Sequence, residues 1–149
     1  LTWGKDTIDT SPSYSPDGAK LVYSSDRSGS LQLYVMNMKT GKSKRVSYGG
    51  GGYAAPVWSP RGDMIAFTKY SGGQFHIGVV RPYGEGERLL TSSWMEDSPT
   101  WSPNGRAIMF SREEKNHPKG LYIVDVISGR VRKFQVGVEA SDPCWDYDD

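Results

Sequence analysis

A short segment recurs along this chain at an almost constant interval, and that interval limits the fold more than any other feature of the sequence. Each copy places a proline two residues before an aromatic residue, and the first three copies continue with Ser-Pro, a variable residue and Gly. The copies occupy residues 12–18, 56–62, 99–105 and, in shorter form, 143–146. Their first prolines are separated by 44, 43 and 44 residues. A repeat of this length indicates that one structural unit is used several times.

The same order of apolar runs and glycine breaks returns within each period. A first run follows the Ser-Pro-x-Gly turn, a second run follows the next glycine, and a Lys/Arg-rich segment closes the period. The first runs are residues 21–24, 65–68 and 108–111, the second runs are 33–36, 77–80 and 121–124, and the closing segments are 44–47, 87–91 and 131–134. Because 18 Gly and nine Pro interrupt every helical stripe, we expect four strands per period and almost no helix.

A period of about 40–45 residues with four antiparallel strands is typical of one blade of a β-propeller. We therefore expect an all-β fold of four-stranded antiparallel blades. The sequence divides into one partial propeller over residues 1–149, with blade repeats at about 8–51, 52–95 and 96–138 and a terminal inner strand at 139–149. We expect the aromatic ring of each recurring segment to pack between neighbouring blades. These rings belong to Tyr14, Trp58, Trp101 and Trp145.

Composition excludes several classes of function. The chain has 18 Lys and Arg against 17 Asp and Glu, which argues against nucleic-acid binding by phosphate neutralisation. No apolar stretch is long enough for a membrane-spanning helix. The single Cys144 cannot form an internal disulfide or a structural zinc site by itself. The first residues lack both an initiator Met and signal-peptide features, from which we expect a processed or excised segment.

No catalytic residue is predicted. Gly41-Lys42-Ser43 lacks the first glycine of a phosphate-binding loop and precedes a predicted strand. No nucleophile elbow is present, and the many serines fall in turns where hydroxyls bond to the backbone. His76 and His117 have no metal ligand at suitable spacing, so we expect a structural His76, a solvated His117 and no catalytic metal.

Carboxylates gather immediately before the predicted inner strands, where the connections between blades meet one mouth of the central channel. They are Asp6, Asp9, Glu96, Asp97, Glu139 and Asp142. One interpretation is that they accept backbone hydrogen bonds and fix the connection between blades. The other is that they belong to a rim on which a partner docks. No cofactor is predicted, although oxygen ligands from several blades leave calcium at this mouth open.

Aromatic and small residues lie beside these carboxylates. They are Thr7, Ile8, Thr10, Tyr53, Ala54, Trp94 and Met95. Exposed aromatic residues beside Met and small polar residues are typical of an interface centre. For Trp94 and Met95, burial between blades is the open alternative.

Four stretches of the chain resemble the later propeller blades of the TolB family, the periplasmic member of the Tol-Pal envelope system. They are residues 55–62, 73–77, 88–93 and 140–145. The resemblance implies the C-terminal half of a six-bladed propeller, a non-enzymatic role in cell-envelope integrity, cell division and protein import, and location in the periplasm of a Gram-negative bacterium. It also implies binding of the lipoprotein Pal, with other Tol proteins and translocating protein segments as further partners.

The resemblance points to the channel mouth as the partner-binding site, because residues 9–12 are similar to a Pal-contacting loop of the family. The predicted partner-binding residues are Asp9, Thr10, Tyr53, Ala54, Trp94, Glu96, Asp97 and Asp142. The motif Trp-Ser-Pro-Asp-Gly also occurs in propellers that cap serine peptidases and lyases. A propeller that gates a peptidase or lyase domain outside this chain is therefore the alternative function.

Three blades and one strand cannot close a propeller, which needs about four to eight blades. The chain is therefore either a fragment of a longer protein or half of a homodimer that completes a six-bladed ring. Association would cover the apolar flanks of the terminal blades, which we expect to be exposed in a single copy.

Overall fold

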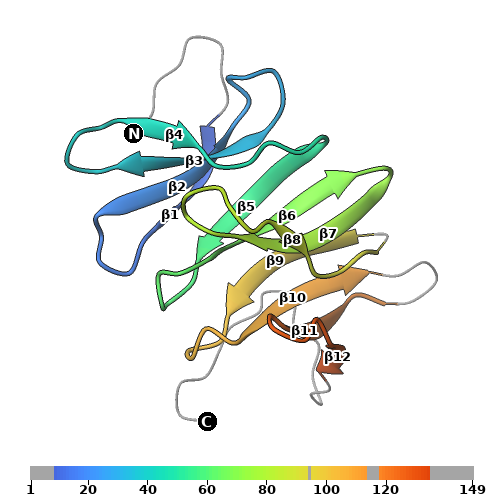
Figure 1. The fold of residues 1–149 in the computed structure, drawn as a ribbon. Helices are drawn as coiled ribbons and strands as arrows, with labels where there is room; N and C mark the ends of the chain where they lie inside the picture. Colours follow the sequence, from blue (N-terminus) through green and yellow to red (C-terminus); the bar gives the residue numbers. More distant parts are fainter. Residues whose placement is uncertain (1–8, 94, 114–117, 135–149) are drawn as a thin grey trace.

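Twelve strands arranged in three antiparallel sheets form the fold in our computed structural model, which describes residues 9–93, 95–113 and 118–134 (Figure 1). The first sheet contains β1 (Asp9–Tyr14), β2 (Lys20–Ser25), β3 (Gln32–Asn37) and β4 (Ser43–Arg45). The second contains β5 (Gly52–Trp58), β6 (Ile65–Ser71), β7 (Gln74–Val80) and β8 (Arg88–Leu89). The third contains β9 (Met95–Trp101), β10 (Ala107–Glu113), β11 (Gly120–Asp125) and β12 (Val131–Phe134). No helix occurs among the described residues.

Each sheet pairs its strands in chain order, so that consecutive strands are neighbours joined by hairpins. Figure 1 shows the three sheets following one another along the molecule, from the blue N-terminal sheet to the orange C-terminal sheet. The first strands lie next to one another, β1 beside β5 and β5 beside β9. This confirms the predicted all-β fold of four-stranded antiparallel blades. The predicted terminal strand at 139–149 lies outside the described residues.

The core lies between the blades, because each strand points successive side chains to opposite faces of its sheet. Between the first and second blades, Val22 and Val35 pack with Trp58 and Phe67 in one buried cluster. The next interface repeats this arrangement: Ala66, Ile77 and Val79 of the second blade pack with Trp101 and Phe110 of the third.

The predicted aromatic wedge is present at both described interfaces. Trp58 and Trp101 are buried in the two clusters. The Trp101 indole Nε1–H donates to the Val57 carbonyl oxygen of the preceding blade at 2.9 Å. Tyr14, at the equivalent position in β1, is 54% exposed, so the prediction of a buried ring is wrong there. The reason is that no described blade precedes β1 to cover the ring.

The outer flanks of the terminal blades differ from the expectation. On the face of the first blade that points away from the second, Leu21, Tyr23, Tyr34 and Met36 form a buried cluster. The Arg27 guanidinium lies 5.3 Å from the ring centre of Tyr23 and 4.9 Å from that of Tyr34, and so covers both rings. A similar cluster of Met109, Leu121 and Ile123 is buried on the third blade. The expectation that these apolar side chains are exposed in a single copy is therefore wrong.

The Ser-Pro-x-Gly turns share one hydrogen-bonding pattern, at the C-terminal ends of the inner strands. The Ser15 hydroxyl donates to Asp17 Oδ1 at 2.6 Å and accepts the backbone N–H of Lys20 at 3.0 Å. In the third blade Asn104 replaces the aspartate and makes the same bond to Ser102 at 2.7 Å. In the second blade the variable residue is Arg61, which cannot accept, and Ser59 donates to Asp63 at 2.9 Å instead.

Removal of the Trp101 ring is expected to destabilise the protein strongly. Trp101→Ala should lower the free energy of unfolding by about 3–5 kcal/mol, because it leaves a cavity between two blades. Tyr14→Ala, at the equivalent but exposed position, should change it by no more than about 0.5 kcal/mol. Urea denaturation followed by circular dichroism measures both. Equal losses in the two variants would contradict the assignment of the indole as the wedge.

Candidate functional site

The first residues of the inner strands lie together at one end of the three blades. Thr10 pairs with Ser24, Ala54 with Thr68 and Asp97 with Ser111, so these positions are equivalent from blade to blade. Because β1 lies beside β5 and β5 beside β9, the starts of the three strands form a continuous row. We call this row, with the connections that lead into it, the channel-mouth rim.

A β-bulge interrupts each inner strand immediately after these residues. The irregularity falls between Thr10 and Ser13 in β1 and between Ala54 and Val57 in β5. In β9 it falls between Asp97 and Thr100, which pair with Ser111 and Met109 of β10. In the bulges Ala55 has φ 51° and Ser98 has φ 56°. A side chain in this left-handed region costs roughly 1–2 kcal/mol. The same unfavourable conformation occurs in two blades, so the bulge is a property of the repeat. A bulge bends its strand and re-aims the neighbouring side chains, here those of the first strand residues at the rim.

Tyr53 stands at the rim of the second blade but is fully buried, with 0% of its surface exposed. Its hydroxyl donates to Glu87 Oε1 at 2.7 Å and accepts the Gly49 backbone N–H at 3.2 Å. The Lys69 ammonium lies 3.5 Å from Glu87 Oε2 and 4.7 Å from the centre of the Tyr53 ring. The expectation that this ring is exposed is wrong, because the ring packs against Phe67 in the cluster between the first and second blades, and Glu87 accepts the hydrogen bond of its hydroxyl.

The same cluster shifts two pKa values. Burial raises the pKa of Tyr53, and the hydrogen bond to Glu87 acts in the same direction. Burial works to lower the pKa of Lys69, but Tyr53 and Glu87 outweigh it and raise this pKa. Both groups therefore keep their protons at neutral pH, and the cluster acts as a fixed link between the blade and the preceding connection.

Glu96 occupies the equivalent place in the third blade and is also fully buried, at 0% exposure. Its Oε2 accepts from Arg112 Nε at 3.2 Å and Nη2 at 3.1 Å, and its Oε1 accepts from the Thr91 hydroxyl at 2.7 Å. Thr91 Oγ1 in turn accepts the Ile77 backbone N–H at 2.9 Å. This chain of bonds connects β7 of the second blade to β9 and β10 of the third.

Glu96 therefore cannot present its carboxylate at the surface of the rim, and the expectation of an exposed carboxylate there is wrong. Burial raises its pKa above the ordinary value, although the Thr91 hydroxyl and the Arg112 guanidinium oppose this shift. Its role is nearer to the interpretation in which the carboxylate fixes the connection between blades. Its partners, however, are side chains, whereas that interpretation named the backbone.

The other predicted site residues are placed less completely. Asp9, Thr10 and Asp97 lie at the starts of β1 and β9, but their side chains are outside the described part of the structure. Ala54 is half-buried at the start of β5. Trp94 and Asp142 lie outside the described residues. The structure thus brings five predicted positions, 9, 10, 54, 96 and 97, together with Tyr53 into one rim.

The rim also carries a pair of aromatic rings, one exposed and one half-buried, that was not among the predicted site residues. Tyr70 and Phe75 flank the turn between β6 and β7, with ring centres 4.9 Å apart. Tyr70 is 51% exposed. The backbone of Ser93, in the connection to the third blade, exchanges two 3.0 Å hydrogen bonds with Phe75. Aromatic residues on both sides of the Gly72-Gly73 turn were the available signal.

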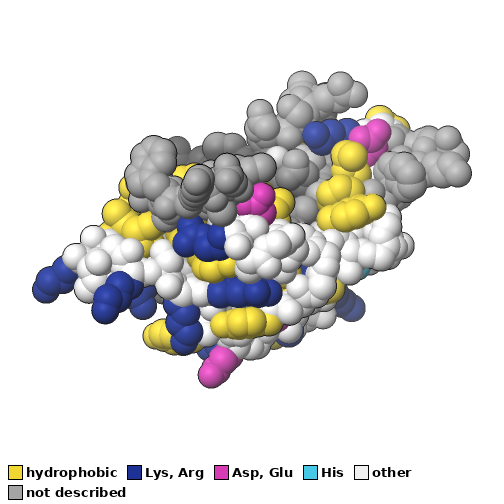
Figure 2. Space-filling model, turned by 90° about the horizontal axis from the view of Figure 1, so that it is seen from above, with side chains coloured by type: hydrophobic (Ala, Val, Ile, Leu, Met, Phe, Trp, Pro, Cys, Tyr) yellow, Lys and Arg dark blue, Asp and Glu magenta, His cyan; other side chains and the backbone are white. Residues whose placement is uncertain are grey.

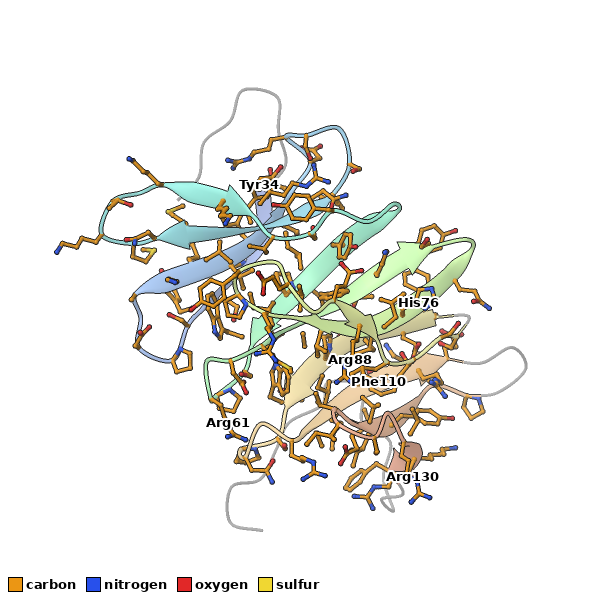
Figure 3. The ribbon with its side chains drawn as sticks, viewed as in Figure 1. Tyr34, Arg61, His76, Arg88, Phe110 and Arg130 are labelled. Atoms are coloured by element: carbon orange, nitrogen blue, oxygen red, sulfur yellow. The ribbon has the colours of Figure 1, made fainter. Side chains whose placement is uncertain are left out.

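The histidine and carboxylate side chains of the described residues were also considered as metal ligands. The described residues contain no group of three or more His, Cys, Asp or Glu side chains placed to hold a metal ion. His76 Nδ1 lies 2.9 Å from the Thr91 carbonyl oxygen, so the ring is tied to the connection between blades (Figure 3). The described segments also include no helix long and apolar enough to cross a bilayer.

Charge is distributed unevenly between the inner and outer parts of the blades. The outer segments 37–48, 81–91 and 125–134 contain nine Lys and Arg but only three Asp and Glu. The rest of the chain contains nine Lys and Arg and 14 Asp and Glu. Figure 2 shows basic side chains spread over the face seen from above, with few acidic ones among the described residues. The outer segments therefore carry a net positive charge of six.

Comparison with known proteins identifies relatives over most of the chain. A family model described as "TolB beta propeller domain" matches residues 2–147. The Tol-Pal system protein TolB of Wolbachia sp. subsp. Drosophila simulans is 49% identical over 118 residues, which cover 78% of this chain and 28% of that protein. The chain therefore spans less than a third of the length of this curated relative.

Solved structures agree with the fold. The structure of putative TolB from Agrobacterium tumefaciens is similar with a TM-score of 0.75 and 26% identity, over 89% of this chain and 50% of that one. An oligogalacturonate lyase in complex with manganese is similar with a TM-score of 0.70 over 88% of this chain and 42% of that one. Since the lyase is only 16% identical, this likeness concerns the fold alone.

Two carboxylates should give the stability of the chain opposite dependences on pH. The pKa of Glu96 is raised in the fold, so its contribution is present at low pH and lost as pH rises above about 4.5. The free energy of unfolding of the native chain, relative to Glu96→Gln, should therefore fall as pH rises through that range. The hydrogen bond from Ser15 lowers the pKa of Asp17, so relative to Asp17→Asn the native chain should lose stability as pH falls below about 4.

Urea denaturation between pH 3 and pH 8 measures both dependences. Asp17→Asn is a suitable control because Asn104 already makes the same bond in the third blade. Slopes of the same sign for the two carboxylates would contradict the burial that we assign to Glu96.

Proposed function

The chain belongs to the TolB β-propeller family, and from this premise we propose that it is a non-enzymatic protein-binding segment of the Tol-Pal system whose channel-mouth rim binds the lipoprotein Pal. Other Tol proteins and translocating protein segments are further partners in this proposal. The segment acts in the periplasm, in support of cell-envelope integrity, cell division and protein import.

The observation that carries the proposal is the row formed by the starts of β1, β5 and β9. Three consecutive blades present equivalent bulged positions at the same end. A partner can therefore contact several blades at once. Tyr70 and Met95, which is 41% exposed, add the kind of aromatic and Met surface that is enriched in interfaces.

Two clusters of polar side chains support the rim indirectly. Tyr53 with Glu87 and Lys69, and Glu96 with Arg112, fix the connections on which the exposed residues stand. A rim held in this way binds its partner without first becoming ordered, which reduces the entropic cost of association. In the proposal, Asp9, Thr10, Ala54, Trp94, Asp97 and Asp142 contact the partner, whereas Tyr53 and Glu96 position them.

Substitutions at the rim should weaken binding of purified Pal without unfolding the chain. Thr10→Arg and Asp97→Lys each place a large cation on the rim, and we expect each to weaken binding by about tenfold or more. Isothermal titration calorimetry measures the affinity, and circular dichroism verifies folding.

Matched controls lie at the opposite end of the blades. Ala19→Arg and Glu85→Lys make the same changes of charge at exposed positions and should leave the affinity unchanged. If they weaken binding as much as the rim variants do, or if none of the four has an effect, the rim is not the binding surface. Failure of the native chain to bind Pal would remove the proposed partner and favour the alternative of a propeller that gates an enzyme domain.

A further inference from the structure

The hairpins that join the third and fourth strands of each blade carry the strongest charge imbalance in the chain. We call residues 37–45, 81–89 and 126–134 the outer hairpins. Together they contain nine Lys and Arg but only two Asp and Glu. The first and third outer hairpins contain seven of these cations and no carboxylate. The outer hairpins therefore carry a net positive charge of seven, whereas the whole chain carries a charge of one.

The same hairpins hold most of the exposed apolar side chains of the described residues. Six of the ten large apolar or aromatic side chains that are exposed there belong to the outer hairpins. They are Met38, Tyr83, Leu89, Ile127, Val131 and Phe134. Tyr83, at 68% exposure, and Ile127, at 67%, are the most exposed of the ten. Cations and exposed apolar side chains therefore occur on the same elements, a combination typical of surfaces that bind lipid.

The tips of the outer hairpins lie together at the end of the blades opposite the channel-mouth rim. The backbone N–H groups of Met38 and Val126 each donate at 2.9 Å to a carbonyl oxygen in the β1–β2 or β9–β10 turn of their own blade. The Tyr83 ring of the second hairpin lies 5.5 Å from the Lys20 ammonium at the β1–β2 turn. Figure 1 shows the turns after β1, β5 and β9 on one side of the molecule. The three tips therefore belong to one surface that crosses all three blades.

The cations of the outer hairpins are not neutralised by carboxylates of the described residues. The ion pairs among those residues join Lys69 to Glu87, Arg106 to Asp125 and Arg112 to Glu96. None of these three cations belongs to an outer hairpin. Lys39, Lys42, Lys44 and Arg130 are exposed. Their charges therefore act on whatever approaches this surface.

The distribution of the apolar side chains favours a lipid surface over a protein partner. A protein interface gathers its aromatic anchors in a desolvated centre and places charged groups around it. Here each blade presents its own tip, and in the third hairpin two cations separate Val131 from Phe134. At a bilayer surface, apolar side chains enter the interfacial layer separately while Lys and Arg side chains meet the headgroups.

We propose that the surface formed by the outer hairpins binds a membrane that contains anionic lipids. Tyr83 and Ile127 enter the interfacial layer of the bilayer, and Lys39, Lys42 and Arg130 lie against the lipid phosphates. The surface lies opposite the channel-mouth rim. The proposal therefore does not depend on the partner of the rim, and the two surfaces act separately.

The test is co-sedimentation of the full chain with vesicles of phosphatidylcholine that contain about one third phosphatidylglycerol. We expect binding at least about tenfold tighter than to vesicles of phosphatidylcholine alone, and weaker binding as the salt concentration is raised. Excess sn-glycerol 3-phosphate, a soluble form of the headgroup, should not release the chain. Release by this compound, equal binding to both kinds of vesicle, or binding to neither would overturn the proposal.

A matched pair of charge reversals tests the position of the surface. Lys42→Glu should weaken binding to the anionic vesicles about tenfold, because it reverses one charge of the first outer hairpin. Lys119→Glu makes the same change at an exposed position in the connection from β10 to β11, at the rim end of the third blade. It should weaken binding by less than about threefold. Equal effects of the two variants would overturn the assignment of the surface.

A second pair tests the apolar contribution. Ile127→Ser should weaken binding to the anionic vesicles about tenfold, since it removes an inserted side chain without changing the charge. Tyr70→Ser, at a position that is 51% exposed at the rim, should leave binding unchanged. Circular dichroism verifies that each variant is folded. If soluble poly-glutamate binds as tightly as the vesicles and Ile127→Ser has no effect, the partner is an acidic protein and the proposal is wrong.

Discussion

Each blade has apolar side chains on both faces of a single sheet, so no blade is stable unless something covers each face. Every other feature of the fold depends on this constraint. Val22 and Val35 of the first blade are covered by the second, and Ala66 and Val79 of the second are covered by the third. The indole rings of Trp58 and Trp101 fill the space where the twisted sheets diverge. Because burial occurs between blades, the Ser-Pro-x-Gly turns and the rim positions recur with the same spacing as the interfaces.

The fold could be predicted almost entirely from the sequence, because the signals that specify it are local. Spacing of the recurring prolines located the inner strands, and the glycine breaks located the hairpins. The prediction was wrong at Tyr14 and at the terminal flanks. The position of a residue in the repeat does not show whether a neighbouring blade covers its ring. It also does not show that Arg27 lies over Tyr23 and Tyr34.

The rim was harder to predict, because the burial of polar residues depends on partners that are distant in the chain. Tyr53 and Glu96 carry polar groups and stand at the rim, which favours exposure when they are considered alone. Their burial depends on Glu87, 34 residues after Tyr53, and on Arg112, 16 residues after Glu96. Nothing in the repeat predicts these partners, since Lys69 and Arg112 occupy a position that holds Ser25 in the first blade. A hydroxyl in the connection that follows the blade does recur in the first two blades. Ser47 and Thr91 each accept a hydrogen bond from a backbone N–H of the third strand of their own blade.

The two ion pairs at the rim share an arrangement that bears on how the number of blades in a propeller can change. Lys69 and Glu87 both belong to the second blade, and Glu96 and Arg112 both belong to the third. In these two blades both members of the ion pair therefore come from the same blade, and the preceding connection contributes only neutral groups such as the Gly49 N–H and the Thr91 hydroxyl. A duplicated blade inserted into the ring would bring its counter-charge with it. Gene duplication can then change the number of blades without matching ionic substitutions in the neighbours, and the repeats remain free to diverge one at a time.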